Sequence, residues 1–301
     1  MTTDSAQENH QGNSTSTASS RIRELVDDIS PASFRSWYRE REVRTNIREG
    51  KPWRNGPSSV PRPPRHYPHQ LNQCHRKIHY RRLNTPQETR PPKGLFWFGS
   101  CFEEDVVVPY LEDWIVGSDE YIRNSMWVDY TITADDVDIE IRGSTDPVIV
   151  DRESDPILLT EVKTKDDVLR VDQPNLHHKA QLHAYLYGLS QAHDDNVTDG
   201  LLIYGGRTSF DLRVFHVTFD PWFWRQTVLA WAAAQTTHQR DGDLPPASPE
   251  HSWECGVCDY RNRCGKAEWA GRMRHLRDFS RGSSILSRKS SRCSKRTSRY
   301  S

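Results

Sequence analysis

Short runs of apolar and β-branched residues recur through the middle of the chain, and longer helical patterns lie before, between and after them. Such runs, bounded by Gly, Pro, Asn or Asp, are typical of strands. The sequence predicts strands at residues 126–133, 137–142, 146–151, 157–163, 200–206 and 211–219. It predicts helices at residues 98–116, 173–191 and 220–238, and a shorter helix that carries Cys74 and the basic run after it. The alternation of strands and helices indicates an α/β fold.

The third and fourth predicted strands are close enough in sequence to form a β-hairpin around the polar stretch 151–156. If the strands pair about the middle of that loop, the facing pairs are Val150 with Ile157, Val148 with Leu159, and Asp146 with Glu161. Lys163 follows Glu161 by two residues and therefore lies on the same side of the strand. A slip of one residue would turn Asp146 to the other face, so the convergence of these groups depends on the register.

Both ends of the chain differ from this middle part. Residues 1–20 are rich in Ser, Thr, Asn and Gln, and we expect them to be disordered. Residues 21–49 have a helical pattern that Pro31 interrupts. The Pro-rich stretch 51–68 reads as an extended linker, so 21–65 forms an N-terminal helical segment and linker. The Ser- and Arg-rich tail 271–301 is predicted to be disordered.

The formal net charge is zero, but the charge is unevenly distributed. Residues 101–172 contain 20 Asp and Glu against 6 Lys and Arg, and this acidic stretch suits a metal site. Residues 272–301 contain 10 Lys and Arg and one Asp. This tail is suited to contact nucleic-acid phosphates, although a purely solvating role explains its composition equally well.

The candidate chemistry gathers on the predicted hairpin. Asp146 and Glu161 provide two carboxylates that can hold a hard divalent cation, and Lys163 provides a positive charge beside an attacking water. The helix at 173–191 contains Gln181 and Tyr185, which are four residues apart and share a helix face. The structural alternative is a surface ion pair at a strand end, followed by a helix with one core aromatic residue.

In order and spacing, these residues resemble the motifs of the PD-(D/E)XK nuclease superfamily. The matching pieces are G-x-x-D from Gly143 to Asp146, E-x-K at Glu161 and Lys163, and Q-x-x-x-Y at Gln181 and Tyr185. The chain is most similar to the RecB-like branch, which includes CRISPR-associated exonucleases and the nuclease domain of AddB. Residues Gly99–Glu104 resemble the first motif of that branch, with Glu103 where many relatives have histidine.

The resemblance covers residues 66–270 and implies a restriction-endonuclease-like core with a mixed β-sheet flanked by helices. It implies that Mg²⁺ or Mn²⁺ is held by Asp146, Glu161, the Val162 carbonyl and either Glu103 or Glu104. Gln181 and Tyr185 would orient Lys163 and the phosphate.

The implied activity is that of a deoxyribonuclease, an exonuclease acting on single-stranded DNA ends. The implied setting is CRISPR spacer acquisition in antiviral defence, with stand-alone DNA repair as the alternative and with integration or repair proteins as partners. A non-catalytic DNA-binding or assembly module is the alternative of another class.

Six cysteines complete the set of candidate residues. Three of them, Cys255, Cys258 and Cys264, have the spacing C-x2-C-x5-C and leave one ligand of a tetrahedral site missing, for which Cys74 is the best candidate. Four thiolates suit zinc or an iron–sulfur cluster, and spacing alone does not separate them. In the RecB-like branch such a set holds a [4Fe–4S] cluster, so the resemblance implies an iron–sulfur subdomain formed by both ends of the domain. Cys101 is expected to be a buried helix residue and Cys293 to be free.

No apolar stretch is long enough to span a bilayer, and the N-terminus has no signal-peptide pattern. We therefore expect a cytoplasmic, reducing setting, in which clustered cysteines favour metal over disulfides.

Overall fold

A computed structural model describes residues 21, 23–48, 64–89, 93–193, 197–209 and 211–265. The chain divides into two compact units, Met1–Ser58 and Ser59–Ser301. Within the described residues, no helix is long and apolar enough to cross a membrane. Residues 1–20 and 271–301, for which disorder is predicted, lie outside the described residues. Cys293 also lies outside them.

In the second unit a five-stranded sheet has the order β1-β4-β5-β6-β7, and a separate ribbon pairs β2 with β3. The strands are β1 (Glu120–Arg123), β2 (Trp127–Ala134), β3 (Val137–Ser144), β4 (Val148–Asp151), β5 (Pro156–Lys165), β6 (Asp199–Gly206) and β7 (Leu212–Thr218). Among the strands of the described residues, only β5 and β6 pair in parallel, and α6 (Leu176–Ala192) connects them, as a parallel crossover requires. The predicted mixed sheet flanked by helices is confirmed.

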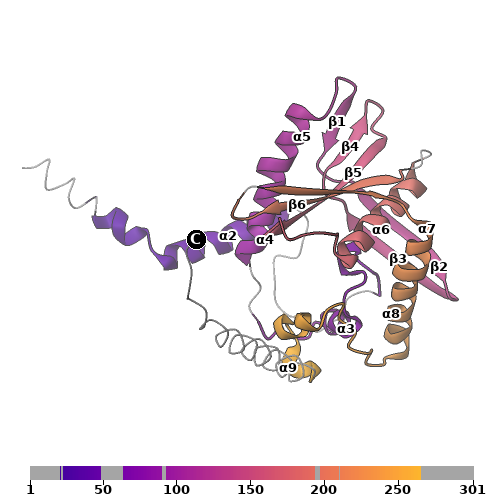
Figure 1. Cartoon of the computed structure of the whole chain (residues 1–301). Helices are drawn as coiled ribbons and strands as arrows, with labels where there is room; N and C mark the ends of the chain where they lie inside the picture. The colour runs from indigo at the N-terminus through magenta and orange to yellow at the C-terminus, as the bar shows by residue number, and fades with distance from the viewer. Residues whose placement is uncertain are drawn as a thin grey trace, which may run out of the picture. The chain divides into compact units, whose positions relative to one another are not determined.

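Helices cover both faces of the five-stranded sheet (Figure 1). On one face lie α4 (Lys93–Phe102), the π-helical turn Glu103–Val107 and α5 (Val108–Trp114). On the other face lies α6, which the β2–β3 ribbon and α8 (Ala230–Asp241) cover in turn. The short helices are α3 (His75–Arg82), α7 (Pro221–Phe223) and α9 (Arg261–Cys264). A π-helical turn at Trp224–Leu229 joins α7 to α8, and 3₁₀ turns lie at Pro68–Gln70 and Ser252–Val257.

The alternation along β5 divides its side chains between these two layers. Val162 packs with Phe102 and Leu111 on the side of α4 and α5. Leu159 packs with Leu182 of α6 on the other side. Glu161 and Lys163 differ from Leu159 by even numbers of residues, so they project toward the α6 layer. The core therefore presents the acid and the lysine to the helix that carries Gln181.

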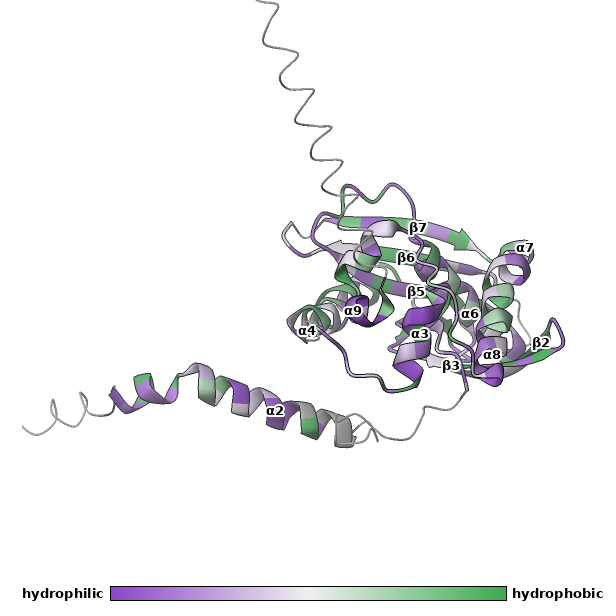
Figure 2. Cartoon of the chain, turned by 90° about the horizontal axis from the view of Figure 1, so that it is seen from below, coloured by the Kyte–Doolittle hydropathy of each residue, from purple (hydrophilic) through white to green (hydrophobic). Residues whose placement is uncertain are grey.

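The first unit contains α2 (Pro31–Arg48). Pro31 is its first residue, so the predicted interruption at this proline is confirmed; proline is well tolerated where a helix begins. Hydrophilic and hydrophobic residues alternate along α2 in Figure 2. Large apolar side chains such as Phe34 and Trp37 are exposed on it.

Four sequence-based expectations need correction. The hairpin pairs Val148 with Leu159 as predicted, but Val150 pairs with Pro156 because the register shifts between Ile149 and Val150. The predicted helix 98–116 begins at residue 93 and contains a π-helical turn. Cys74 directly precedes α3 and lies outside it.

The fourth correction concerns the end of the Pro-rich stretch. His66 is buried and pairs with Ile141 of β3, so residues 64–68 belong to the folded unit instead of a linker. The backbone explains this: His66 N–H donates to Glu140 O at 2.8 Å, and Arg142 N–H donates to His66 O at 3.0 Å.

Candidate active site and cysteine pocket

Asp146 sits where the chain leaves β3 and enters β4, next to the middle of β5. Thr145 fixes this crossing, because its backbone N–H donates to Met126 O and its hydroxyl accepts from Met126 N–H at 2.8 Å. The pairing with β5 continues as far as Pro147, whose carbonyl accepts from Thr160 N–H at 3.0 Å. The Asp146 carboxylate then accepts from Val162 N–H at 2.7 Å. The Asp146 side chain thus extends the hydrogen bonding to β5 beyond the first residue of β4.

Glu161 is fully buried, with 0% of its surface exposed, and pairs with Lys163 through Oε1. Lys163 Nζ also lies 4.0 Å from Asp146 Oδ2. Burial, followed by the charge of Asp146, raises the pKa of Glu161 to about 8, against the opposing effect of Lys163. Burial lowers the pKa of Lys163, but Glu161 and Asp146 outweigh it and the net pKa is raised. The lysine is therefore a stable positive charge between two acids.

Glu103, not Glu104, faces this group. It is half-buried, whereas Glu104 is exposed. Burial and the charge of Asp146 raise the pKa of Glu103 to about 8, and Lys163 acts in the opposite direction. The acid of the first motif thus lies within electrostatic reach of the other two groups, and the helix is rotated so that position 103 points inward.

Gln181 and Tyr185 of α6 are both buried and hydrogen-bonded to each other. Burial, followed by the charge of Glu161, raises the pKa of Tyr185, which places its hydroxyl near the buried acid. Gly143 permits this approach: a Cβ atom there would lie 2.8 Å from Pro68 Cδ and 3.4 Å from Tyr185 Cε1. The glycine of the G-x-x-D segment therefore makes room for the tyrosine of the Q-x-x-x-Y segment.

This close approach gives a stability prediction. Gly143→Ala should destabilise the protein by about 1–3 kcal/mol because the methyl group must displace a rigid proline ring. The melting temperature should fall by roughly 3–10 °C. Gly99→Ala is the matched control: Gly99 lies within α4, and nothing lies within 4 Å of its Cβ position, so alanine should keep or raise the melting temperature. Equal melting temperatures for the two variants would contradict the packing argument.

The donor atoms of the acid cluster suit a divalent cation. Glu161 Oε2 is buried and has no hydrogen-bond partner among the described residues. A hard cation favours oxygen ligands, and carboxylate oxygens are what Glu161, Asp146 and Glu103 supply. No group of three or more His, Cys, Asp and Glu in the described ranges is already arranged around a metal position. The chemistry of the donors and the unpartnered oxygen nevertheless fit Mg²⁺ or Mn²⁺.

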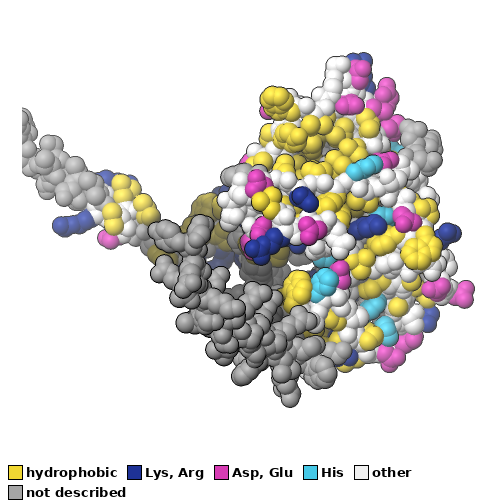
Figure 3. Space-filling model, in the orientation of Figure 1, with side chains coloured by type: hydrophobic (Ala, Val, Ile, Leu, Met, Phe, Trp, Pro, Cys, Tyr) yellow, Lys and Arg dark blue, Asp and Glu magenta, His cyan; other side chains and the backbone are white. Residues whose placement is uncertain are grey.

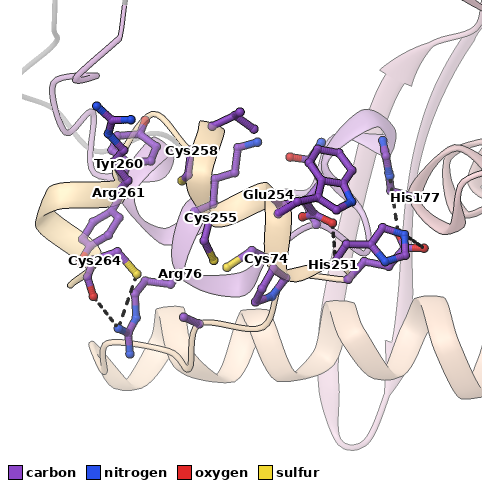
Figure 4. A pocket seen from close by; sticks show the side chains of 18 of the residues that line it. Cys74, Arg76, His177, His251, Glu254, Cys255, Cys258, Tyr260, Arg261 and Cys264 are labelled. Atoms are coloured by element: carbon purple, nitrogen blue, oxygen red, sulfur yellow. Dashed lines mark hydrogen bonds and ion pairs between the residues drawn. The ribbon is translucent and has the colours of Figure 1, made fainter. Parts of the chain in front are cut away.

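The four cysteines that were predicted to be metal ligands line one pocket of about 210 Å³. Figure 4 shows the side chains of Cys74, Cys255, Cys258 and Cys264 around the same end of it. Burial, then the neighbouring thiols of Cys74, Cys264 and Cys258, raise the pKa of Cys255. Cys101 lies in α4 as predicted, but it is half-buried instead of buried, and it does not line the pocket. An all-sulfur donor set fits both zinc and an iron–sulfur cluster.

Polar contacts hold the cysteine loop to the preceding part of the chain. Arg76 Nη1 lies 3.8 Å from Cys264 Sγ and donates to it. The Glu88 carboxylate accepts from the N–H groups of Asn262 and Arg263 at 2.9 and 3.0 Å. Glu88 could not be predicted from the sequence, because an isolated acid in a loop carries no spacing pattern. Arg76 belongs to a basic run that was visible in the sequence, without an indication of its partner.

A sequence profile described as the PD-(D/E)XK nuclease superfamily matches residues 66–265, about two thirds of the chain. This chain belongs to the PD-(D/E)XK nuclease superfamily. Membership implies metal-dependent hydrolysis of phosphodiester bonds, commonly with Mg²⁺ or Mn²⁺, and DNA as the substrate. The matched range spans Glu103, Asp146, Glu161, Lys163 and the residues that line the cysteine pocket.

The chain was also compared with solved structures. Eighteen chains of known structure match. One is described as the crystal structure of SSO0001 and aligns with a TM-score of 0.48 and 16% sequence identity. The alignment covers 75% of the present chain and 94% of that chain. No curated protein matches.

Proposed function

We propose that this PD-(D/E)XK protein is a RecB-like exonuclease that hydrolyses single-stranded DNA from an end. The observation that carries the proposal is the fully buried Glu161, which has one oxygen unpartnered among the described residues and pairs through the other with Lys163, whose Nζ also lies 4.0 Å from Asp146 Oδ2. A buried, incompletely paired acid costs stability, and a non-catalytic module has no need to bear that cost. The non-catalytic alternative is therefore the weaker one.

In the proposed site, Asp146, Glu161, Glu103 and the Val162 carbonyl would hold Mg²⁺ or Mn²⁺. The ion would supply Lewis-acid activation of the phosphate and of an attacking water. Lys163 keeps its proton, so it would orient that water by hydrogen bonding and offset the charge that develops on the phosphate. Tyr185 and Gln181 would hold this arrangement from the α6 side.

The surface is consistent with a strand end as the substrate. Acidic and basic side chains are intermingled over the described surface visible in Figure 3. Binding along duplex DNA draws on many phosphate contacts from basic side chains. A substrate that enters a localised pocket needs fewer such contacts, and an unpaired strand is narrow enough to do so.

Digestion of end-labelled single-stranded DNA tests this function. We expect mononucleotides or short products to appear with Mn²⁺ or Mg²⁺ and cleavage to stop with EDTA. A circular single strand of the same sequence is the control, because an exonuclease cannot begin on it. Cleavage of the circle at the rate of the linear strand would overturn the exonuclease assignment, and cleavage of neither would overturn the nuclease assignment.

We propose further that the four pocket cysteines hold a [4Fe–4S] cluster, with structural zinc as the alternative. The ligands come from the segment before α3 and from the segment that ends in α9, so the cluster would tie together two parts far apart in sequence. Iron, sulfide and zinc content of anaerobically purified protein separates the two. One zinc and no iron would overturn the iron–sulfur assignment and keep the four ligands.

For the biological setting we propose trimming of CRISPR spacer precursors, with stand-alone DNA repair as the alternative. We also propose a domain arrangement in which residues 66–270 form the nuclease, preceded by the helical segment and linker and followed by the basic tail. The two settings differ in substrate: short overhangs on duplexes in the first, long single strands in the second. Relative cleavage rates on these substrates distinguish the settings.

The first-motif acid gives a paired prediction. Glu103→Gln should lower the cleavage rate by roughly 10²-fold or more, because it removes a charge that faces Asp146. Glu104→Gln changes the exposed neighbouring acid and should leave the rate within about twofold of wild type. Single-turnover cleavage at saturating Mn²⁺ measures both. Equal losses would show that position 103 is not the inward-facing acid.

A further inference from the structure

The cysteine pocket extends well beyond its four thiols. Its other end is lined by Asn175, His177, Glu250, His251 and Trp253. Trp253 is 56% exposed although it lines the pocket, and its ring is stacked on that of His251, with centroids 6.0 Å apart and planes at 23°. An exposed indole that is already stacked on one side offers its remaining surface to a flat partner.

The backbone fixes the orientation of this pair. Glu254 Oε1 accepts from His251 N–H at 2.9 Å, and the His251 side chain accepts from Glu254 N–H. These reciprocal bonds form a capping box at the start of the turn Ser252–Val257, which carries Trp253. The side chain of His251 also lies 3.5 Å from Glu250 Oε1. The pair is therefore held in place before any ligand arrives.

A chain of contacts leads from this end of the pocket to the acid cluster. The rings of His177 and His178 are 4.1 Å apart, and His178 Nδ1 lies 2.9 Å from the hydroxyl of Tyr204. Tyr204 is the partner of Lys163 in the pairing of β6 with β5. Burial, then the charges of Lys165 and Lys163, lower the pKa of His177 to about 4, so both lysines lie within electrostatic reach of the pocket.

The composition of this end favours a base over a phosphate. His177 is neutral at physiological pH, and the carboxylate of Glu250 lies 4.0 Å from its Nδ1. An acidic group repels a phosphate and a neutral group does not attract it. An aromatic face stacks on any base, and this stacking contributes about 1–3 kcal/mol of binding free energy per base. The cysteine end of the pocket is lined by Arg76 and Lys77, and Arg76 is already bonded to Pro245 O and to Cys264, so both residues add positive charge there.

We infer that Trp253, stacked on His251, is a platform for an unpaired base of the DNA strand whose phosphate lies in the active site. This inference rests on the proposed function and adds to it a specific subsite. The platform would hold the strand so that bases on one side of the reacting phosphate are gripped without regard to their sequence. It explains why an exposed tryptophan stands beside the cysteine loop.

Binding can be measured without cleavage. We would use the unaltered protein in EDTA and a fluorescent oligothymidylate, and move a single abasic site along the strand. One position, or two adjacent ones, should weaken binding by roughly 5- to 100-fold, as expected for the loss of one stacked base. A flat profile would overturn the platform.

Variants then assign the effect to Trp253. Trp253→Ala should weaken binding of the intact strand by the same factor and should remove the sensitivity to the abasic position, while Trp253→Phe should restore most of the affinity. Trp222→Ala is the matched control, because Trp222 is 67% exposed at the start of α7 and does not line the pocket. Iron and zinc content identify any variant that has lost its metal, and the abasic profile of the unaltered protein then decides alone.

The outcomes separate this inference from the proposed function. Cleavage of linear single strands by wild-type protein, together with unchanged binding by Trp253→Ala, would refute the platform and leave the nuclease intact. Position-dependent binding that Trp253→Ala abolishes, without cleavage in any divalent metal, would refute the nuclease and leave the platform as a DNA-binding site.

Discussion

Asp146→Asn should lower the single-turnover cleavage rate by roughly 10³-fold while it leaves the melting temperature within a few degrees of wild type. The reason lies in what Asp146 does structurally. Its Oδ2 accepts from Val162 N–H, and the amide oxygen of asparagine can accept the same hydrogen bond. The substitution therefore removes a negative charge from the proposed metal site without breaking the junction between β3 and β5.

Alanine would be a poorer choice for the same test. Asp146→Ala leaves the buried N–H of Val162 without its acceptor, at a cost of about 1–3 kcal/mol, so lost activity and lost structure would be confounded. Lys163→Ala would likewise leave the fully buried Glu161 without its cation. Lys179→Ala is a suitable control, since Lys179 lies over the ring of Phe223 and takes no part in the site. Near-normal cleavage by Asp146→Asn would exclude Asp146 from the metal site.

The second large effect is expected at the cysteines. Replacing Cys74, Cys255, Cys258 or Cys264 by serine should remove the metal and the brownish absorption of an iron–sulfur protein. The free energy of unfolding should fall by about 3–5 kcal/mol, and the melting temperature by roughly 10 °C, because the link between two distant segments is lost. Each variant should also aggregate more readily.

Cys101→Ser provides the comparison. Cys101 is half-buried in α4 and is not part of the pocket, so its metal content should equal that of wild type. If Cys74→Ser keeps its full metal content while Cys255→Ser loses it, the three C-terminal cysteines hold the metal without Cys74. The proposed link between the two ends of the domain would then be wrong.

Much of the fold could be predicted because β5 and its neighbours are strongly patterned. The six predicted strands all exist, and the alternation correctly placed Glu161 and Lys163 on one side. Strand β1 was missed because Glu120–Arg123 is short and half polar. The register shifts between Ile149 and Val150, where Ile157 has no partner in the pairing, and the turn beyond contains Ser154 with a left-handed φ of 74°. Serine gives no sequence signal for that conformation.

The choice between Glu103 and Glu104 could not be predicted for a different reason. It depends on the rotation of α4, and packing sets that rotation. Phe102 lies directly over Gly205 of β6, where a Cβ atom would come within 2.2 Å of the ring. Gly205 is far from Phe102 in sequence, yet its contact with Phe102 determines which of the two acids faces inward. Periodicity within one helix carries no information about such a distant contact.

The separation of the pocket cysteines has a consequence for biosynthesis. Chains emerge from the ribosome N-terminus first, so Cys74 appears before the sheet and its three companions only after every strand has been made. If the pocket binds metal as proposed, a chain interrupted between them carries a single thiol of the set and cannot be loaded. Only chains that extend past Cys264 could then bind the metal. Products that end earlier would remain colourless and would be open to proteolysis.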